Sequence, residues 1–246
     1  MELGDIYALG SHRLMCGDAT KKEDVLKLVG SEKINLVLTD PPYGMKIQHK
    51  NGTIGGDKFG KAGITHFQHK AQRKINNYPK ILGDDSTDAA RENYYIVSDL
   101  CDMLIIWGGQ YFADFLPVNG GWIFWDKLRP NTLDFGSGEL AYNTCSNVVK
   151  KYAQKWNGAI REGSKNLNPQ PLLHPTQKPV ELHMSILQDF SKEWDVVLDC
   201  FAGSGTTLIA CEMTGRKCLT MEISPEYCEI ICKRFEKLTG IKPVKL

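Results

Sequence analysis

Short apolar runs alternate along the chain with longer amphipathic stretches, a pattern typical of an α/β protein. Runs rich in β-branched and aromatic residues predict five buried strands, at Ile34–Thr39, Met103–Trp107, Trp122–Trp125, Val196–Asp199 and Lys217–Met221. Amphipathic stretches predict five helices, at Lys21–Val29, Thr87–Cys101, Pro179–Phe190, Thr206–Met213 and Pro225–Leu238. This alternation favours a mostly parallel twisted sheet with helices on both faces, where ligands bind at the carboxyl ends of the strands.

Length and composition are those of an ordinary globular chain. The 246 residues, 42% hydrophobic and 24% charged, suffice for one domain with a sizeable core. No apolar run reaches about 18 residues, so no membrane span is predicted. The start, Met1–Asp5, lacks a charged-then-apolar leader, so we expect a cytoplasmic protein. The cysteines form no Cys-x-x-Cys pair and no zinc-finger spacing, so no metal site is predicted.

Charge is distributed unevenly, although the net charge is only +1. Residues 46–80 hold eight basic residues against one acid, and residues 127–172 hold seven against three. The rest of the chain is therefore net acidic. A basic run is usually a solvated face, but two such runs in loop-like, Gly- and Asn-rich sequence favour a polyanionic partner.

A glycine-rich turn follows the strand at Val196–Asp199. Gly203 and Gly205 would let the backbone approach a ligand, and the helix that starts there would point free N–H groups toward it. Glu222, at the end of the next strand, is placed to accept hydrogen bonds from two ribose hydroxyls. Leu208 stands where a dinucleotide motif has its third glycine, so a single nucleoside is the cofactor predicted. A purely structural turn is the alternative for the glycine pair taken alone.

A stiff loop, Asp40-Pro41-Pro42-Tyr43, follows the strand that ends at Thr39. Its two prolines fix φ and remove two N–H donors. An exocyclic base amine is a poor nucleophile because its lone pair is delocalised into the ring. The Asp40 carboxylate and the Pro41 carbonyl would accept its hydrogen bonds and favour the pyramidal form, while Tyr43 offers a flat face for the base. Amine methylation without a metal or a covalent intermediate is therefore predicted; for Asp-Pro alone, a capped structural turn would be preferred.

Four motifs in this order resemble the amino-type (N6-adenine or N4-cytosine) DNA methyltransferases of the beta arrangement, over essentially the whole chain. In that family the Asp-Pro-Pro-Tyr loop precedes the glycine turn, as Asp40 precedes Gly203 here. The segment His174–Pro179 resembles an additional cofactor-binding stretch, and Cys16-Gly17-Asp18 resembles an amino-terminal Gly-Asp element. The resemblance implies a Rossmann-like methyltransferase fold that uses S-adenosylmethionine.

The resemblance also implies roles for individual residues. Asp18 should lie near the cofactor adenine, and His174, Thr176 and Lys178 near its methionine end. The cofactor-binding residues expected together are Asp18, Asp40, His174, Thr176, Lys178, Asp199, Phe201, Ala202, Gly203, Ser204, Gly205, Thr206, Thr207 and Glu222. The chain is expected to be one domain over 1–246, with a catalytic half at about 1–128, a target-recognition segment at about 129–173 and a cofactor-binding half at about 174–246.

Double-stranded DNA is the substrate that the motif order and the basic segments favour. The basic residues expected to contact it are Lys70, Arg73, Lys74, Lys150, Lys151, Lys155 and Arg161. By resemblance, a loop that begins with Asp favours the N6 amine of adenine, and N4-cytosine is the alternative. RNA and protein amine methyltransferases usually place the glycine turn first, contrary to the order here.

A non-catalytic DNA-binding regulator with a vestigial cofactor fold is the alternative from another class. The intact catalytic and cofactor motifs argue against it. The resemblance implies frequent homodimers. The sequence shows no nuclease signature, so a restriction endonuclease would be a separate partner.

Overall fold

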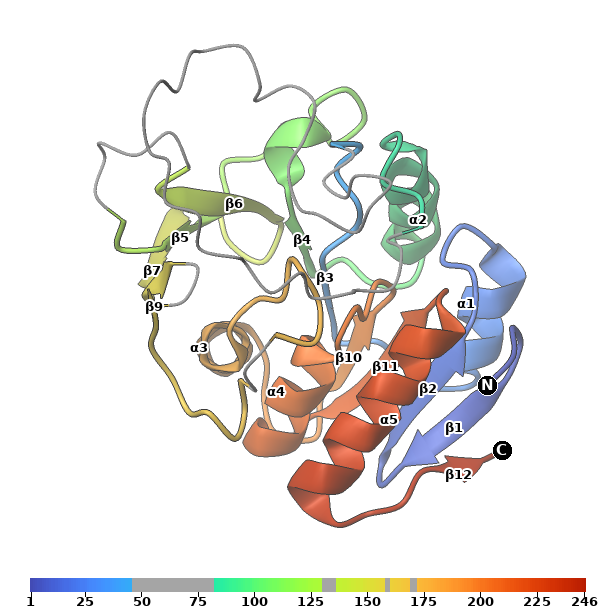
Figure 1. The fold of residues 1–246 in the computed structure, drawn as a ribbon. Helices are drawn as coiled ribbons and strands as arrows, with labels where there is room; N and C mark the ends of the chain where they lie inside the picture. Colours follow the sequence, from blue (N-terminus) through green and yellow to red (C-terminus); the bar gives the residue numbers. More distant parts are fainter. Residues whose placement is uncertain (46–81, 130–135, 158–159, 169–171) are drawn as a thin grey trace, which may run out of the picture.

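The computed structural model describes residues 1–45, 82–129, 136–157, 160–168 and 172–246 (Figure 1). Its centre is a ten-stranded sheet with the strand order β12-β1-β2-β11-β10-β3-β4-β6-β5-β7, and β8 and β9 form a separate pair. The strands are β1 (Ile6–Leu9), β2 (His12–Cys16), β3 (Leu36–Thr39), β4 (Leu104–Trp107), β5 (Trp122–Asp126), β6 (Gly138–Asn143), β7 (Val149–Ala153), β8 (Trp156–Asn157), β9 (Ile160–Arg161), β10 (Val196–Asp199), β11 (Lys217–Glu222) and β12 (Val244–Lys245).

The middle of the sheet is parallel. Strands β2, β11, β10, β3 and β4 run in one direction, so their carboxyl ends meet at one edge. Strand β6 is antiparallel to both β4 and β5, and β1 forms an antiparallel hairpin with β2. The three central strands β10, β3 and β4 are buried at every position, as expected for strands covered on both faces.

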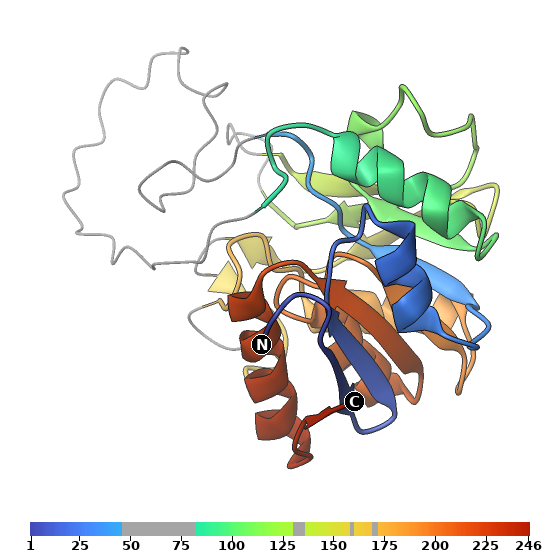
Figure 2. The same cartoon turned by 90° about the vertical axis from the view of Figure 1, so that its right-hand side faces the viewer.

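Helices cover both faces of the sheet, which confirms the α/β fold predicted (Figures 1 and 2). One face carries α1 and α2, and the other carries α3, α4 and α5. Their bounds are α1 (Lys22–Val29), α2 (Asp88–Ser98), α3 (Val180–Phe190), α4 (Thr206–Thr214) and α5 (Pro225–Thr239), with a short 3₁₀ turn η2 (Gly109–Tyr111). Within the described ranges, no helix is both long and apolar enough to cross a membrane.

All five predicted strands and all five predicted helices are present, with ends shifted by at most a few residues. The pattern missed the strands at the two sides of the sheet. Strand β7, with the sequence VKKYA, alternates exposed and half-buried positions, so it lacks the apolar run of a buried strand. Strand β1, with the sequence IYAL, is apolar but only four residues long, and β2 and β6 mix polar with apolar residues; their pairing partners fix all three.

The loops after the parallel strands form the functional edge of the molecule. Asp40 follows β3, Gly108 follows β4, and the glycine turn follows β10. Glu222 is the last residue of β11, and Asp18 comes shortly after β2. The two predicted motifs therefore lie at the carboxyl ends of adjacent strands, as the parallel arrangement requires.

Candidate active site

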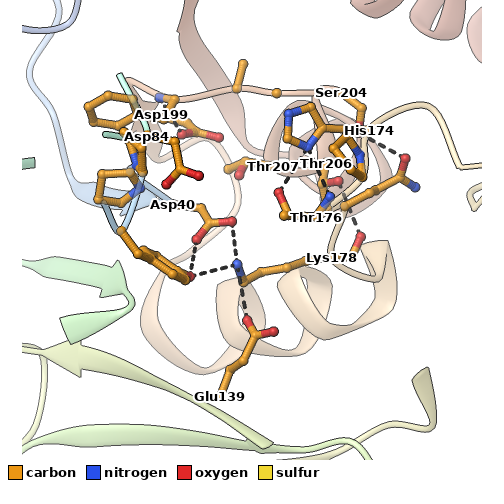
Figure 3. A pocket seen from close by; sticks show the side chains of 18 of the residues that line it. Asp40, Asp84, Glu139, His174, Thr176, Lys178, Asp199, Ser204, Thr206 and Thr207 are labelled. Atoms are coloured by element: carbon orange, nitrogen blue, oxygen red, sulfur yellow. Dashed lines mark hydrogen bonds and ion pairs between the residues drawn. The ribbon is translucent and has the colours of Figure 1, made fainter. Parts of the chain in front are cut away.

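A cavity of about 770 Å³ opens at this edge of the sheet (Figure 3). Residues from all four predicted motifs line it. They are Asp18, Asp40, Pro41, Pro42, Tyr43, His174, Thr176, Lys178, Asp199, Phe201, Ala202, Gly203, Ser204, Thr206, Thr207 and Glu222.

Gly205 is the one predicted cofactor contact that does not line the cavity. It precedes α4 with φ +79°, and a Cβ there would lie 3.1 Å from Ile231 of α5. Its missing side chain thus serves the left-handed turn and the close approach of α5, not the approach of a ligand. Gly203, at φ +53°, does line the cavity, and a Cβ there would meet His174 at 3.6 Å.

Backbone groups hold Glu222. Its Oε2 accepts the Gly203 N–H at 2.9 Å, and its Oε1 accepts the Ser224 N–H at 2.9 Å. Burial raises the pKa of Glu222 to about 7, although these hydrogen bonds oppose the rise. The carboxyl group is therefore fixed against the glycine turn and titrates near neutral pH.

Asp199 joins the two predicted motifs. Its Oδ1 accepts the hydroxyl of Thr39 at 2.8 Å and the N–H of Phe201 at 3.1 Å. Thr39 directly precedes the catalytic loop, and Phe201 begins the glycine turn. Burial raises the pKa of Asp199 to about 6. This side chain fixes the end of β3 relative to the end of β10, and so holds the two loops in register.

Short polar contacts also shape the loops around His174 and Asp18. The Nδ1 atom of His174 accepts the Thr176 N–H at 3.3 Å and lies 3.0 Å from the Thr176 hydroxyl. Burial, with the nearby Lys178, lowers the pKa of His174 to about 3, so its imidazole is neutral at pH 7. Asp18 Oδ1 accepts both the N–H and the hydroxyl of Thr20, at 3.0 and 2.7 Å.

Lys178 reaches the catalytic loop. Its side chain is 4% exposed, and its ammonium forms a short ion pair with Asp40. The same Nζ donates to Tyr43 Oη at 3.3 Å and lies 3.4 Å from Glu139 Oε2 (Figure 3). Burial opposes the charge, but Asp40 and Glu139 outweigh it and raise the pKa of Lys178 above its ordinary value. The resemblance implied a contact with the methionine end of the cofactor; in this structure the ammonium lies at Asp40, the carboxylate predicted to be catalytic.

Tyr43 is held firmly. Its hydroxyl donates to Asp40 Oδ1 at 2.5 Å, and its ring stacks on Tyr111 with centroids 5.2 Å apart. Burial and the charge of Asp40 raise its pKa well above the ordinary value, so the phenol stays protonated. The ring also covers Gly108, where a Cβ would lie 2.2 Å from it. The loop is thus rigid through side-chain packing as well as through its prolines.

Glu139 and Lys127 also line the cavity near Asp40, and neither is among the site residues predicted from the sequence. Glu139 lies on β6, and its carboxylate pairs with Lys178 and, through a short contact, with Lys127. Although burial opposes it, these two ammonium groups hold the pKa of Glu139 below its ordinary value, and the carboxylate is charged. No local signal marks Glu139, because its place depends on how β6 pairs with β4 and β5.

Gln177 belongs to the His174–Pro179 segment but is not one of the predicted cofactor contacts. Its Oε1 accepts the Leu173 N–H at 3.2 Å and the Ser204 hydroxyl at 3.1 Å. Its Nε2 is buried in the cavity wall and has no hydrogen-bond partner among the described residues. An amide with one end satisfied and the other unused suits contact with a ligand acceptor.

Among the predicted DNA-binding residues, the described ones lie on β7, on β9 and in the segment between β7 and β8. Lys150 pairs with Asp189 at 3.1 Å and Lys151 with Asp126 at 2.8 Å, from adjacent positions of β7. Of the described members of the set, only Arg161 lines the cavity, with its guanidinium 5.1 Å above the Trp156 ring. Lys155 lies outside the cavity lining. The remaining members, Lys70, Arg73 and Lys74, lie outside the described residues.

Comparison with known sequences identifies relatives along most of the chain. A family described as DNA methylase matches residues 119–233. The type II methyltransferase M.HinfI of Haemophilus influenzae is 24% identical over 259 residues, covering 94% of this chain and 69% of the relative. M.HpaI of Haemophilus parainfluenzae is 26% identical over 255 residues, covering 91% and 74%. The DNA adenine methyltransferase YhdJ of Escherichia coli (strain K12) is 43% identical over 63 residues, covering 26% and 21%.

Solved structures share the fold. The complex of M1.HpyAVI with S-adenosylmethionine matches with a TM-score of 0.52 and 21% identity, covering 90% of this chain and 98% of that chain. The PvuII DNA methyltransferase (cytosine-N4-specific) matches with a TM-score of 0.55 and 16% identity, covering 92% and 89%. The chain is therefore similar to the N6/N4 amino-type DNA methylases: the DNA methylase family matches residues 119–233, and type II methyltransferases align with most of its length.

Proposed function

We propose that this chain transfers a methyl group from S-adenosylmethionine to the N6 amine of adenine in double-stranded DNA. One observation carries the proposal: a single cavity joins the loop containing Asp40 to the turn containing Gly203 and Glu222. The choice of adenine has two supports. The catalytic loop begins with Asp, which by family resemblance favours adenine, and the relative YhdJ is named as an adenine methyltransferase.

The residues around the glycine turn fit a cofactor made of a nucleoside that carries an amino acid. Glu222 is a buried carboxyl suited to accept two ribose hydroxyls, and Asp18 offers a carboxylate to the adenine. The unused Nε2 of Gln177 is a donor suited to the carboxylate of the methionine part. When bound, S-adenosylmethionine supplies an electrophilic methyl group on a sulfonium.

The catalytic loop supplies the acceptors that the target amine requires. Asp40 and the carbonyl of Pro41 accept the two N–H bonds and favour a pyramidal nitrogen with an available lone pair. As the nitrogen gains a fourth bond its protons become acidic, and the Asp40 carboxylate is placed to take one. Tyr43, stacked on Tyr111, forms the aromatic platform for the extruded base. Asp199 and Thr39 keep this platform in register with the glycine end.

DNA contacts are assigned to the segment at about 129–173 and to the basic residues after the catalytic loop. Arg161 and Arg129 lie at the cavity wall beside Trp156, where the guanidinium of Arg161 can meet a phosphate or a base edge. Lys70, Arg73 and Lys74 stay predicted contacts with the phosphate backbone.

The test is identification of the product. The purified chain is incubated with methyl-deuterated S-adenosylmethionine and unmethylated double-stranded DNA, and the nucleosides are separated by chromatography and weighed by mass spectrometry. We expect deuterated N6-methyladenine. Deuterated N4-methylcytosine would overturn the choice of base, and label in a matched RNA but not in DNA would overturn the choice of substrate. Modification-sensitive sequencing of the same DNA then gives the recognised site.

A further inference from the structure

We infer that Glu139 is a positioning residue for methyl transfer: it draws the Lys178 ammonium away from Asp40 when the target amine binds. This inference rests on the proposed catalytic role of Asp40. It starts from a conflict visible in the cavity, where the carboxylate that should receive the amine already has two donors (Figure 3).

Both oxygens of Asp40 are engaged. Oδ1 accepts the Tyr43 hydroxyl at 2.5 Å, and Oδ2 accepts the ammonium of Lys178. A cation in contact with this carboxylate opposes catalysis, because the target nitrogen becomes positively charged as it is methylated. The negative charge of Asp40 stabilises that change only when it is not already neutralised by Lys178.

Lys178 needs another anion when it leaves Asp40. Its side chain is 4% exposed, so water cannot replace the lost partner, and an unpaired buried charge is strongly unfavourable. The rings of Trp107 and Tyr43, at 5.1 and 5.8 Å from Nζ, offer only weaker cation–π contacts.

Glu139 is the anion that can accept the Lys178 ammonium in place of Asp40. Its Oε2 lies 3.4 Å from Lys178 Nζ. A charge-assisted bond has an N–O distance of about 2.8 Å, so a movement of about 0.6 Å completes it. Lys127 holds the other oxygen, Oε1, and its ammonium is seated 4.7 Å from the centre of the Trp125 ring. Glu139 is therefore oriented before the amine arrives.

The four groups form a line of alternating charge: Asp40, Lys178, Glu139 and Lys127. In this line, Lys178 has two positions that differ little in distance. On Asp40 it neutralises the carboxylate; closer to Glu139 its bond to Asp40 is weakened, so that the amine can compete for that oxygen. The Tyr43 hydroxyl can remain on Asp40 in both, since it brings no charge.

Glu139→Gln tests the inference because it removes the charge and keeps the shape. Lys178 should then stay on Asp40, and kcat should fall by about ten- to hundredfold. The Kd for S-adenosylmethionine and the KM for DNA should change by less than about threefold. Glu32→Gln is the matched control: Glu32 is 26% exposed against 27% for Glu139, pairs with Lys217 at 2.6 Å, and lies outside the cavity lining. It should keep the kcat of the unchanged chain.

A pH profile separates positioning from a merely structural role. The charged and titratable groups around the Lys178 ammonium are Asp40, Tyr43, Lys127, Glu139, His174 and His183. Loss of the Glu139 charge lowers the pKa of Lys178. As the pH rises, Lys178 in the Glu139→Gln variant should lose its proton and free Asp40, so kcat of this variant should recover toward that of the unchanged chain. An equal loss at every pH would overturn the inference.

A double variant completes the test. With Lys178→Met already present, adding Glu139→Gln should change kcat by less than about twofold, because the cation that Glu139 controls is gone. The same loss in both backgrounds would overturn the inference. If Asp40→Asn keeps full kcat, the proposed function fails; if Asp40→Asn is inactive and Glu139→Gln is fully active, the inference alone fails.

Lys127→Met provides a second approach if Glu139→Gln does not fold. It leaves both carboxylates but loosens Glu139, so kcat should fall by about three- to tenfold. Unchanged kcat in a folded Lys127→Met variant would overturn the inference.

Discussion

The two ends of the cavity are built by different means. At the cofactor end, Glu222 is held by the N–H groups of Gly203 and Ser224, which are close to it in the fold and belong to rigid turns. At the base end, Asp40 is held by the side chains of Tyr43 and Lys178, and a further carboxylate stands behind Lys178. The first end is preorganised. At the second end, Asp40 must exchange Lys178 for the target amine before methyl transfer.

This difference separates binding from turnover. A carboxyl group fixed by backbone donors has little freedom to rearrange, so its substitution should lower the affinity for the cofactor. A change at a carboxylate whose partners are other side chains should instead lower the rate of the chemical step.

Asp40→Asn should remove turnover and spare the cofactor. The neutral amide no longer stabilises the charged nitrogen, so kcat should fall by at least about 10²–10³-fold. The Kd for S-adenosylmethionine, measured by calorimetry, should stay within about threefold. Loss of cofactor binding instead would show that the two ends are not separable.

Glu222→Gln should give the opposite pattern. Replacing an ionised acceptor of two hydroxyls weakens hydrogen bonds worth about 1.5 kcal/mol or more each, so cofactor affinity should fall about ten- to hundredfold. At saturating cofactor, kcat should change by no more than about threefold. Unchanged affinity would remove Glu222 from the cofactor site.

The pH dependence of cofactor affinity also tests whether Glu222 binds the cofactor. Burial raises the pKa of Glu222 to about 7. The ionised form is the better acceptor, so affinity should be full above this pKa and fall as the pH drops through it. Between pH 8 and pH 6 we expect a loss of about tenfold, absent in Glu222→Gln. Identical profiles for the two proteins would assign the titration to another group.

Gly108→Ala probes the packing of the base end, with Gly240→Ala as its control. Both glycines have φ +76°, so each alanine should cost about 1–2 kcal/mol of unfolding free energy. A Cβ at Gly108 would lie 2.2 Å from the Tyr43 ring, whereas at Gly240 no described atom outside its immediate neighbours lies within 4 Å. Only Gly108→Ala should therefore lower kcat, by about five- to tenfold. Equal kcat in the two variants would mean that Tyr43 need not be held in place.

Arg161→Ala should give the smallest effect, on DNA affinity alone. Loss of the cavity-lining guanidinium should lower the affinity for DNA about three- to fivefold. The salt dependence of binding should show about one fewer ion released. Lys151→Ala is the control, because its ammonium already pairs with Asp126 at 2.8 Å. Fluorescence anisotropy with labelled DNA at two salt concentrations measures both. A larger loss of DNA affinity in Lys151→Ala than in Arg161→Ala would indicate that DNA contacts β7.

The same contrast explains what the sequence could predict. The glycine end lies in continuous strand-turn-helix segments, where spacing and local chemistry place Gly203 and Glu222 without knowledge of the rest of the chain. The helix ends follow from similar local signals: Ser224 accepts the Tyr227 N–H at 3.4 Å, and Gly240 ends α5 with a positive φ.

The base end could not be predicted in the same way. Glu139 meets Lys178 only because β6 enters the sheet between β4 and β5, out of chain order. That choice of neighbours depends on non-local pairing, which a one-dimensional pattern does not contain. The place of Gly205 outside the cavity lining has a related cause: a glycine motif does not disclose which residues of the turn face α5.

The strand order also determines when the proposed site can be completed during synthesis of the chain. Strand β3, which leads into Asp40, pairs with β10, and β2 pairs with β11, which ends at Glu222. A growing chain can pair β3 with β4 early, but β3 lacks its β10 neighbour until most of the chain has left the ribosome. An unfinished chain therefore has the Asp40 carboxylate for the target amine but no complete site for the methyl donor, so we expect fragments to be inactive.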